Sequence, residues 1–145
     1  MKGIIREIKA EDKASLMQMM RDFYTSPAVH TNGSDEIFSR DIESCINGSP
    51  YTEGYVFDAG GDILGYAMIA KSYSTEFGKA CIWIEDLYVK DKYRAMGLGR
   101  RFLDFITGKY TDCIFRLEVE AENAGAVRLY EQYGFTFLPY QQMKK

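Results

Sequence analysis

Arg94-Ala95-Met96-Gly97-Leu98-Gly99 is the most informative stretch of this sequence, because it joins a strand-like run, Cys81 to Val89, to a helix-like run, Arg100 to Lys109. Gly97 and Gly99 have no Cβ, so the backbone there can turn through positive φ and approach a bulky anion closely. The start of a helix also leaves N–H donors free and carries a partial positive charge. The stretch therefore predicts a cradle for a pyrophosphate. A glycine turn between strand and helix is common in α/β proteins, however, so the string alone is a weak signal.

A second cluster of residues lies further along the chain, and it strengthens the first. Its members are Asn123, Ala126, Leu129, Tyr130, Gly134 and Phe135. Asn123 and Tyr130 are two helical turns apart, so their side chains lie on one face of a helix. Gly134 stands where a C-cap glycine belongs, and the run 135–138 has strand character.

The two motifs in this order resemble the acetyl-CoA-binding half of the GNAT superfamily of N-acetyltransferases, over about Cys81 to Leu138. The run Ile84-Glu85-Asp86-Leu87-Tyr88-Val89 is similar to a strand of the diamine and polyamine subgroup. The resemblance implies an acetyl-CoA-dependent enzyme that transfers acetyl directly to a primary amine of a small molecule, such as a diamine, polyamine or lysine-like compound. A protein or peptide N-acetyltransferase and a non-catalytic CoA-binding regulatory module remain alternatives, and the family's habit of dimerising suggests a homodimer.

Composition is that of an ordinary globular domain. The chain has 145 residues, of which 46% are hydrophobic and 27% charged, and its net charge is −3 from 18 basic and 21 acidic residues. These values favour a single domain spanning residues 1–145, with no broad basic field for nucleic acid or an anionic membrane. Cys45, Cys81 and Cys113 are odd in number and far apart, which suits neither a disulfide framework nor a zinc site. We expect no metal, no signal peptide, no membrane anchor and a cytoplasmic location.

The pattern of apolar residues predicts an α/β (α+β) fold in the order β-α-α-β-β-β-α-β-α-β. The expected elements before the cradle are a strand from Gly3 to Ile8, a helix from Glu11 to Tyr24, a helix capped by Ser34 and stopped by Gly48, a hairpin of 53–58 and 62–72 around Gly60-Gly61, and a strand from Lys79 to Val89. Consecutive strands indicate a mixed, mostly antiparallel central sheet, and the strand-helix-strand unit indicates one parallel pair. In the resembling family this parallel pair splays apart to admit the cofactor arm.

The resemblance assigns a set of cofactor-binding residues. They are Leu87, Tyr88, Val89, Arg94, Ala95, Met96, Gly97, Leu98, Gly99, Arg100, Asn123 and Ala126. Asn123 could equally be an N-cap and nothing more. Arg101, next to the cradle, could lie near a phosphate or could simply face solvent. Ala95 occupies a position that the family often fills with glycine, which places the geometry of the loop in question.

Glu85 and Asp86 are adjacent acids in an otherwise apolar strand, and such acids need a reason. An alkylamine with a pKa of about 10.4 is rarely neutral at pH 7, a deficit of roughly 4.6 kcal/mol, so an acetyl acceptor needs a base. The resemblance makes Glu85 the base or the residue that positions a water, with Glu85, Asp86 and Tyr24 contacting the substrate. The alternative is that these acids form ion pairs across the sheet, and that Tyr24 packs in the core.

Tyr130 stands where the family places the general acid that protonates the departing thiolate. A phenol of pKa near 10 can protonate a thiolate of pKa near 8.5 at a cost of about 2 kcal/mol. The alternative is that Tyr130 only packs, as we expect for Tyr133. The family also suggests a β-bulge near Leu87 that frees a main-chain N–H for the oxyanion. His30 has no partner residue that would make it a metal ligand.

Overall fold

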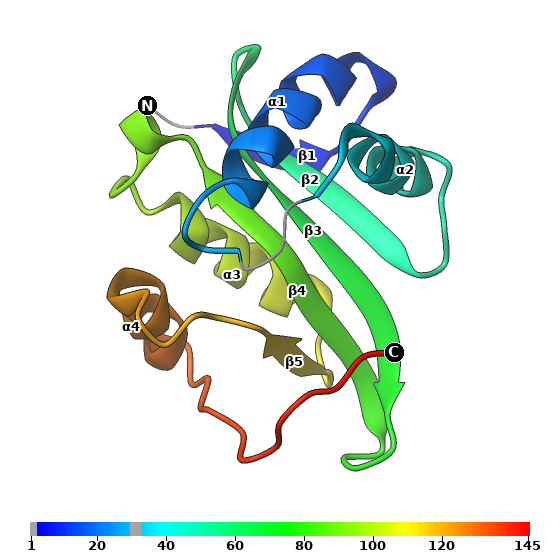
Figure 1. Ribbon diagram of the computed structural model, residues 1–145, viewed down its shortest axis with the longest axis vertical. Coiled ribbons are helices and arrows are strands. Elements are labelled where there is room, and N and C mark those ends of the chain that lie inside the picture. The colour runs from blue at the N-terminus through cyan, green and yellow to red at the C-terminus, as the bar shows by residue number, and fades with distance from the viewer. Residues whose placement is uncertain (1–2, 30–32) are drawn as a thin grey trace.

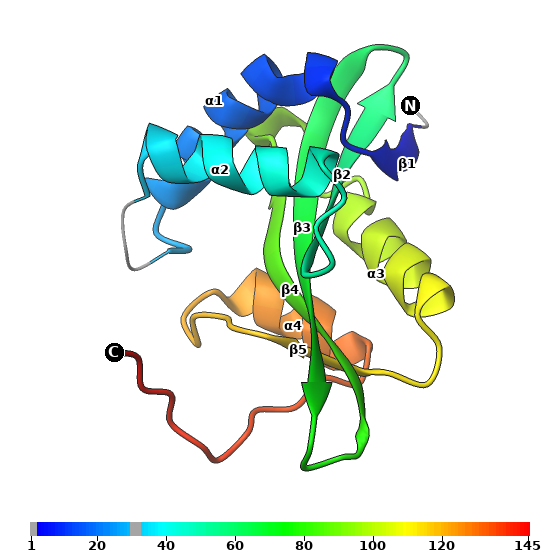
Figure 2. The ribbon, with the colours of Figure 1, turned by 90° about the vertical axis from the view of Figure 1, so that its right-hand side faces the viewer.

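The computed structural model describes residues 3–29 and 33–145, which form one five-stranded sheet with helices on both faces (Figures 1 and 2). The elements are β1 (Ile4–Glu7), η1 (Ala10–Asp12), α1 (Lys13–Tyr24), α2 (Asp35–Ile46), β2 (Thr52–Ala59), β3 (Asp62–Ser74), β4 (Lys79–Val89), η2 (Asp91–Tyr93), α3 (Leu98–Lys109), β5 (Ile114–Leu117) and α4 (Ala124–Gln132). Within these residues, no helix is long and apolar enough to cross a membrane.

The strands lie in the order β1-β2-β3-β4-β5. The first four pair antiparallel, and β4 and β5 form the parallel pair that the sequence predicts. The β2–β3 hairpin turns at Gly60 and Gly61, whose φ angles of 68° and 101° are those that glycine adopts without strain. The mixed, mostly antiparallel sheet is therefore confirmed.

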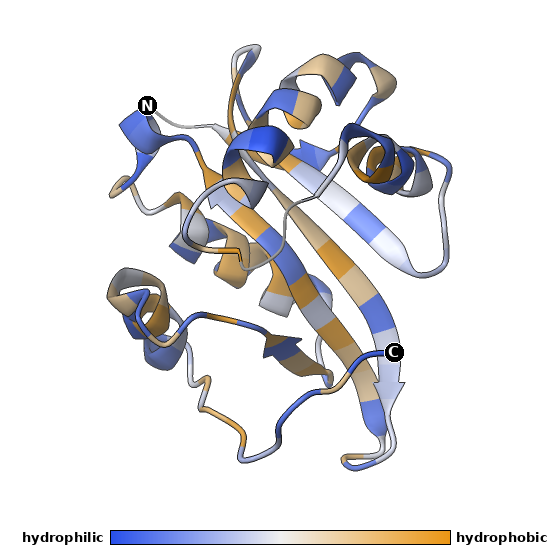
Figure 3. Ribbon diagram, in the orientation of Figure 1, coloured by the Kyte–Doolittle hydropathy of each residue, from blue (hydrophilic) through white to orange (hydrophobic). Residues whose placement is uncertain are grey.

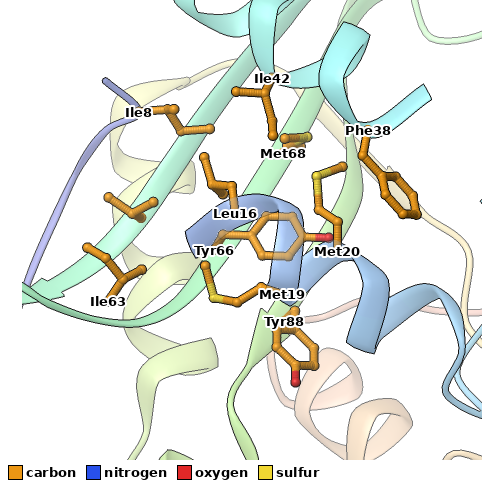
Figure 4. Packing of buried hydrophobic residues seen from close by; sticks show 11 residues of the cluster. Ile8, Leu16, Met19, Met20, Phe38, Ile42, Ile63, Tyr66, Met68 and Tyr88 are labelled. Atoms are coloured by element: carbon orange, nitrogen blue, oxygen red, sulfur yellow. The ribbon is translucent and has the colours of Figure 1, made fainter. Parts of the chain in front are cut away.

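One core lies between the sheet and the helices α1 and α2 (Figure 4). Leu16 and Met20 of α1 and Ile42 of α2 are fully buried against Val56 and Tyr66 of the sheet. Ser34 caps α2 by accepting a hydrogen bond from the backbone N–H of Ile37, as its position before the helix predicts.

A second core lies on the opposite face, under α3 and α4. Phe102, Leu103 and Ile106 of α3 are fully buried against strand residues such as Phe57 and Ile82. β4 is mostly hydrophobic, with a hydrophilic interruption along its length (Figure 3). The sheet therefore holds α1 and α2 on one side and α3 on the other, and β4 contributes side chains to both cores.

The C-terminal end of α3 is fixed to the sheet by Glu53 of β2. This carboxylate accepts hydrogen bonds from Lys71 and Lys109, at 3.1 and 3.3 Å, and from the hydroxyls of Tyr55 and Tyr110. Burial alone raises the pKa of Glu53, but hydrogen bonds from Tyr110, Tyr55 and Lys71 outweigh it and lower the pKa to about 2. The carboxylate therefore stays ionised, and it fixes the direction in which the opposite end of α3 points.

The prediction of a final strand at residues 135–138 is wrong. After Gly134, which closes α4 at φ 87°, these residues form no ladder with β5. The alternating pattern has strand propensity, but a strand also needs a partner and a face to bury. Here Phe137 is 61% exposed and Leu138 46% exposed, so the segment gains little from joining the sheet.

Candidate active site

A cleft of about 920 Å³ opens between the ends of β4 and β5, the start of α3 and the start of α4. It brings together most of the predicted site residues, which are Glu85, Leu87, Tyr88, Val89, Arg94, Ala95, Gly97, Leu98, Gly99, Arg100, Asn123, Ala126 and Tyr130. The structure does not place Met96, Asp86 or Tyr24 on its walls, and Met96 is 43% exposed. Two stretches of the chain, 84–100 and 118–130, thus meet at the carboxyl ends of the parallel pair, where α/β sheets commonly bind ligands.

The cleft forms where the pairing of β4 with β5 ends. Their last ladder pair is Ile84 with Leu117, where β5 ends, whereas β4 continues to Val89. The main chain of β4 beyond Ile84 therefore lacks a partner on the β5 side, and its polar groups are available to a ligand. The expected splaying of the parallel pair agrees with this geometry.

The start of α3 has the features of an anion cradle. Gly97 takes φ 78° as the N-cap, and a Cβ built there meets nothing within 4 Å, so the position faces open space. The first backbone hydrogen bond of the helix runs from Arg101 to Gly97, and no side chain of the described residues caps this end. The N–H groups of the first turn consequently remain for a ligand.

Gly99 has a different role from Gly97. A Cβ at Gly99 would meet Leu129 of α4 at 3.1 Å, so this glycine allows α4 to approach α3 closely. Ala95, the residue at the family's glycine position, has φ 64°. The loop therefore keeps the left-handed turn without glycine, at a cost of about 1 kcal/mol.

The three arginines of this segment divide between the cleft and the scaffold. Arg94 donates from Nε to the carbonyl of Val89 at 2.8 Å and pairs with Asp91 at 2.6 Å, so it holds η2 to the end of β4. Arg100 lines the cleft and hydrogen-bonds Gln132 of α4. Arg101 does not line the cleft, and it donates to the carbonyl of Gly3, just before β1, so it belongs to the scaffold. This contact disfavours the alternative of a solvated side chain.

A β-bulge lies at Glu85. On β3, Met68 pairs with Asp86 and the next residue, Ile69, pairs with Ile84, so Glu85 is the extra residue. The bulge thus lies two residues before its expected place at Leu87, which pairs normally with Ala67. It also reverses the phase of the strand, because Ile84 belongs to the α3 core whereas the buried Asp86 faces α1.

Glu85 projects from the bulge into the cleft. Its side chain is exposed, yet its pKa is raised. The main cause is that the protein partly shields the carboxyl group from water, and the second is the repulsion from the negative charges of Asp86 and Glu118. None of the described residues forms an ion pair with Glu85, which disfavours the alternative of a cross-sheet salt bridge. A carboxylate with a raised pKa is a stronger base.

Asp86 and Tyr24 lie behind the cleft. Asp86 is 4% exposed and accepts hydrogen bonds from the hydroxyls of Tyr24 at 3.0 Å and Tyr66 at 2.7 Å. Burial raises the pKa of Asp86 to about 6, although the two hydroxyls act in the opposite direction. This network joins α1, β3 and β4, so in this structure Asp86 and Tyr24 support the wall that carries Glu85.

Tyr130 lies on α4 and lines the cleft, and its ring packs edge to face against Phe135 at 5.7 Å. Desolvation raises the pKa of Tyr130 to about 12, above the ordinary phenol value of 10 from which the sequence prediction starts. The phenol therefore remains protonated at any physiological pH. Tyr133 faces α3 instead, where its hydroxyl donates to Asp104 at 2.7 Å.

Asn123 is the N-cap of α4, since its side chain accepts a hydrogen bond from Ala126 N at 3.4 Å. Both residues also line the cleft, so the structural role and the predicted contact are compatible. His30 lies outside the described residues. Among residues 3–29 and 33–145, no group of His, Cys, Asp and Glu is arranged to hold a metal ion.

Sequence reasoning did not single out the acidic residues that follow β5. Glu118, Glu120 and Glu122 line the cleft, and the charge of Glu118 acts on Glu85. The repetition of an acid at every second position from 118 to 122 is the signal that the sequence offers. The cleft therefore has a cationic end at the start of α3 and an acidic end between β4 and β5.

Residues 14–135 match the acetyltransferase (GNAT) family. The chain belongs to this family. It is an N-acetyltransferase, and acetyl-CoA is its acetyl donor. The chain is 29% identical to "Thialysine N-epsilon-acetyltransferase" of Sus scrofa over 90% of this chain and 82% of the relative. It is 25% identical to "Spermine/spermidine N(1)-acetyltransferase" of Bacillus subtilis over 53% of this chain and 55% of the relative.

Solved structures show the same fold. A possible acetyltransferase from Clostridium difficile 630 superimposes with a TM-score of 0.81 at 18% identity, over 100% of this chain and 97% of the other. The structure of AAC(6')-Iy in complex with the bisubstrate analogue CoA-S-monomethyl-acetylneamine has a TM-score of 0.80 at 13% identity, over 100% and 98%. The GNAT fold expected from the sequence is thus confirmed.

Proposed function

We propose that this GNAT enzyme transfers acetyl directly from acetyl-CoA to the primary amine of a small cationic molecule, a diamine, polyamine or lysine-like compound. The observation that carries the proposal is a single cleft with an anion cradle at the start of α3 and carboxylates at its opposite end, Glu85 and Glu118 among them. The names of the relatives, which concern thialysine, spermine and spermidine, support an amine of this kind.

The residues of the cradle fit the donor. The open space in front of Gly97 and the free N–H groups of the first turn of α3 suit a pyrophosphate, and Arg100 adds a cation on the same wall. The unpaired side of β4 from Glu85 to Val89 suits an amide-containing arm, which binds as a neighbouring strand does. Acetyl-CoA supplies a reactive thioester at the end of that arm.

Glu85 receives the proton of the acceptor amine, directly or through a water. An ammonium group is attracted to the acidic end of the cleft, and its neutral form is the nucleophile. Because the pKa of Glu85 is raised, the proton transfer is less uphill than it would be to an ordinary carboxylate. Main-chain N–H groups of 85–87 on the side of β4 that has no partner strand, next to the bulge at Glu85, are the proposed donors to the developing oxyanion.

Tyr130 supplies the proton that the leaving thiolate takes up. With a pKa of about 12 the phenol is fully protonated at neutral pH, and proton donation to a thiolate of pKa near 8.5 is uphill by about 5 kcal/mol. A turnover of about 10 s⁻¹ corresponds to a barrier of about 16 kcal/mol, so a step of this size fits within it.

The proposal is tested by following thiol release from acetyl-CoA with a panel of diamines, polyamines, basic amino acids, aminoglycosides and lysine-containing peptides. Rapid release with small amines supports it. Release with peptides alone would indicate a protein N-acetyltransferase, and CoA binding without release would indicate a regulatory module. The single domain at residues 1–145, the cytoplasmic location and the homodimer stay predictions.

A further inference from the structure

A second cavity, of about 580 Å³, adjoins the cleft along β5 and the C-terminal segment. Trp83 of β4 and Arg116 of β5 line it on the sheet side, and Phe137 and Tyr140 line it on the other. Glu118, Val119 and Tyr130 line both cavities, so the second lies directly beside the acidic end of the cleft. We refer to it as the β5 groove.

Arg116 carries a buried donor without a partner. Trp83 and Arg116 are paired in the β4–β5 ladder, and the guanidinium carbon lies 4.7 Å from the centre of the Trp83 ring. Among the described residues, the Nε of Arg116 is the only buried side-chain nitrogen or oxygen that lacks a hydrogen-bond partner. The described residues give Arg116 no hydrogen bond and no ion pair, although the residue lines the groove, and its enclosed Nε leaves the terminal Nη groups as the donors for an acceptor from outside the chain.

We propose that Arg116 binds a carboxylate of the acceptor, so that the preferred substrate is an amino acid whose side chain ends in a primary amine. A guanidinium stacked on an aromatic ring still presents a planar edge, and two N–H groups of that edge match the two oxygens of a carboxylate. This inference rests on the proposed function, because the amine must reach Glu85 and Glu118 while Arg116 holds the other end.

The charges along β5 suit a lysine-like molecule. Arg116 and Glu118 are two positions apart at the end of β5, so their side chains leave the chain on the same face, and both line the β5 groove. An amino acid with a terminal amine offers a carboxylate to the first and an ammonium group to the second. A polyamine of similar length fits less well, because it offers a cation and no anion to Arg116.

The test compares L-lysine and thialysine with cadaverine, which is lysine without its carboxylate, at saturating acetyl-CoA. The wild-type protein is expected to show a kcat/KM at least about 10-fold higher for the two amino acids than for cadaverine, and Arg116→Gln to lower this ratio about 10-fold or more. Arg116→Lys keeps the charge but loses the planar fork, so its ratio is expected to fall between the two. Arg128→Gln, which changes an exposed arginine of α4, is the matched control and should keep the wild-type ratio.

A wild-type preference for cadaverine or spermidine would overturn the inference and leave the acetyltransferase function intact. An equal loss with both kinds of amine in Arg116→Gln would also overturn it, because a structural role affects both alike. If no amine releases thiol, the proposed function fails. Calorimetry with the CoA-saturated protein then decides the inference separately, since it predicts tighter binding of L-lysine than of cadaverine and is refuted by the reverse order or equality.

Discussion

Tyr130→Phe removes a single hydroxyl from the cleft and tests the proposed general acid. The ring packing against Phe135 survives the change, and among the described residues no hydrogen bond to the lost hydroxyl is present. Without the phenol, the remaining donor is water, whose pKa of 15.7 is almost four units above the value of about 12 for Tyr130. This difference is worth about 5 kcal/mol, and if half of it is felt in the transition state, kcat falls by about 10².

The assay is thiol release under saturating acetyl-CoA and amine, together with a calorimetric titration of CoA. We expect the affinity for CoA to change less than twofold, since Tyr130 acts only on the leaving thiolate. Tyr133→Phe is the control, because its hydroxyl donates to Asp104 and to the main-chain carbonyl of Arg100 on α3 and has no part in the proposed proton transfer; it should lower stability by about 1 kcal/mol and leave kcat unaltered. Wild-type turnover in Tyr130→Phe would show that the thiolate obtains its proton elsewhere.

Three further changes probe the base, the loop and the buried acid. Glu85→Gln should move the pH optimum of kcat/KM upward, because the amine must then lose its proton to solvent, and an unshifted profile would return Glu85 to a structural role. Ala95→Gly should relieve the strain of the left-handed conformation at this position and stabilise the fold by up to about 1 kcal/mol, with the affinity for CoA preserved. A clear fall in the melting temperature would contradict the strain. Because the pKa of Asp86 is raised from 3.8 to about 6, ionisation of this group penalises the folded state, and the penalty grows from about pH 4 and is nearly complete at pH 7. Relative to wild type, Asp86→Asn should therefore gain about 2 kcal/mol of stability between pH 4 and pH 7 in denaturation experiments, and a difference independent of pH would disprove the shift.

Local chemistry explains which parts of the fold could be predicted. The Gly60-Gly61 hairpin, the Ser34 cap and the glycine at the start of α3 are set by residues within a few positions of one another. The sequence therefore placed these elements, and with them the cradle, within a residue or two. The strand β4 was predicted with the bounds that the structure gives, Lys79–Val89.

The features that could not be predicted depend on partners distant in sequence. The bulge at Glu85 is a property of pairing with Met68 and Ile69, and no pattern in β4 alone locates it. The burial of Asp86 depends on two tyrosine hydroxyls, one of which lies 62 residues away. The missing final strand has the same origin, because strand propensity at residues 135–138 is overridden when no neighbouring strand pairs with them.

The central claim is that the first turn of α3 grips the pyrophosphate of acetyl-CoA, and calorimetric titration of CoA measures this most directly. The wild-type protein should bind one CoA per chain, and Gly97→Val should weaken binding at least about 10-fold, because a branched side chain at φ 78° strains the loop and fills the open space in front of it. Gly108→Ala, in the same helix but facing open space away from the cleft, should bind as wild type does. Absence of CoA binding by the wild-type chain at millimolar concentration, or wild-type affinity in Gly97→Val, would contradict the account.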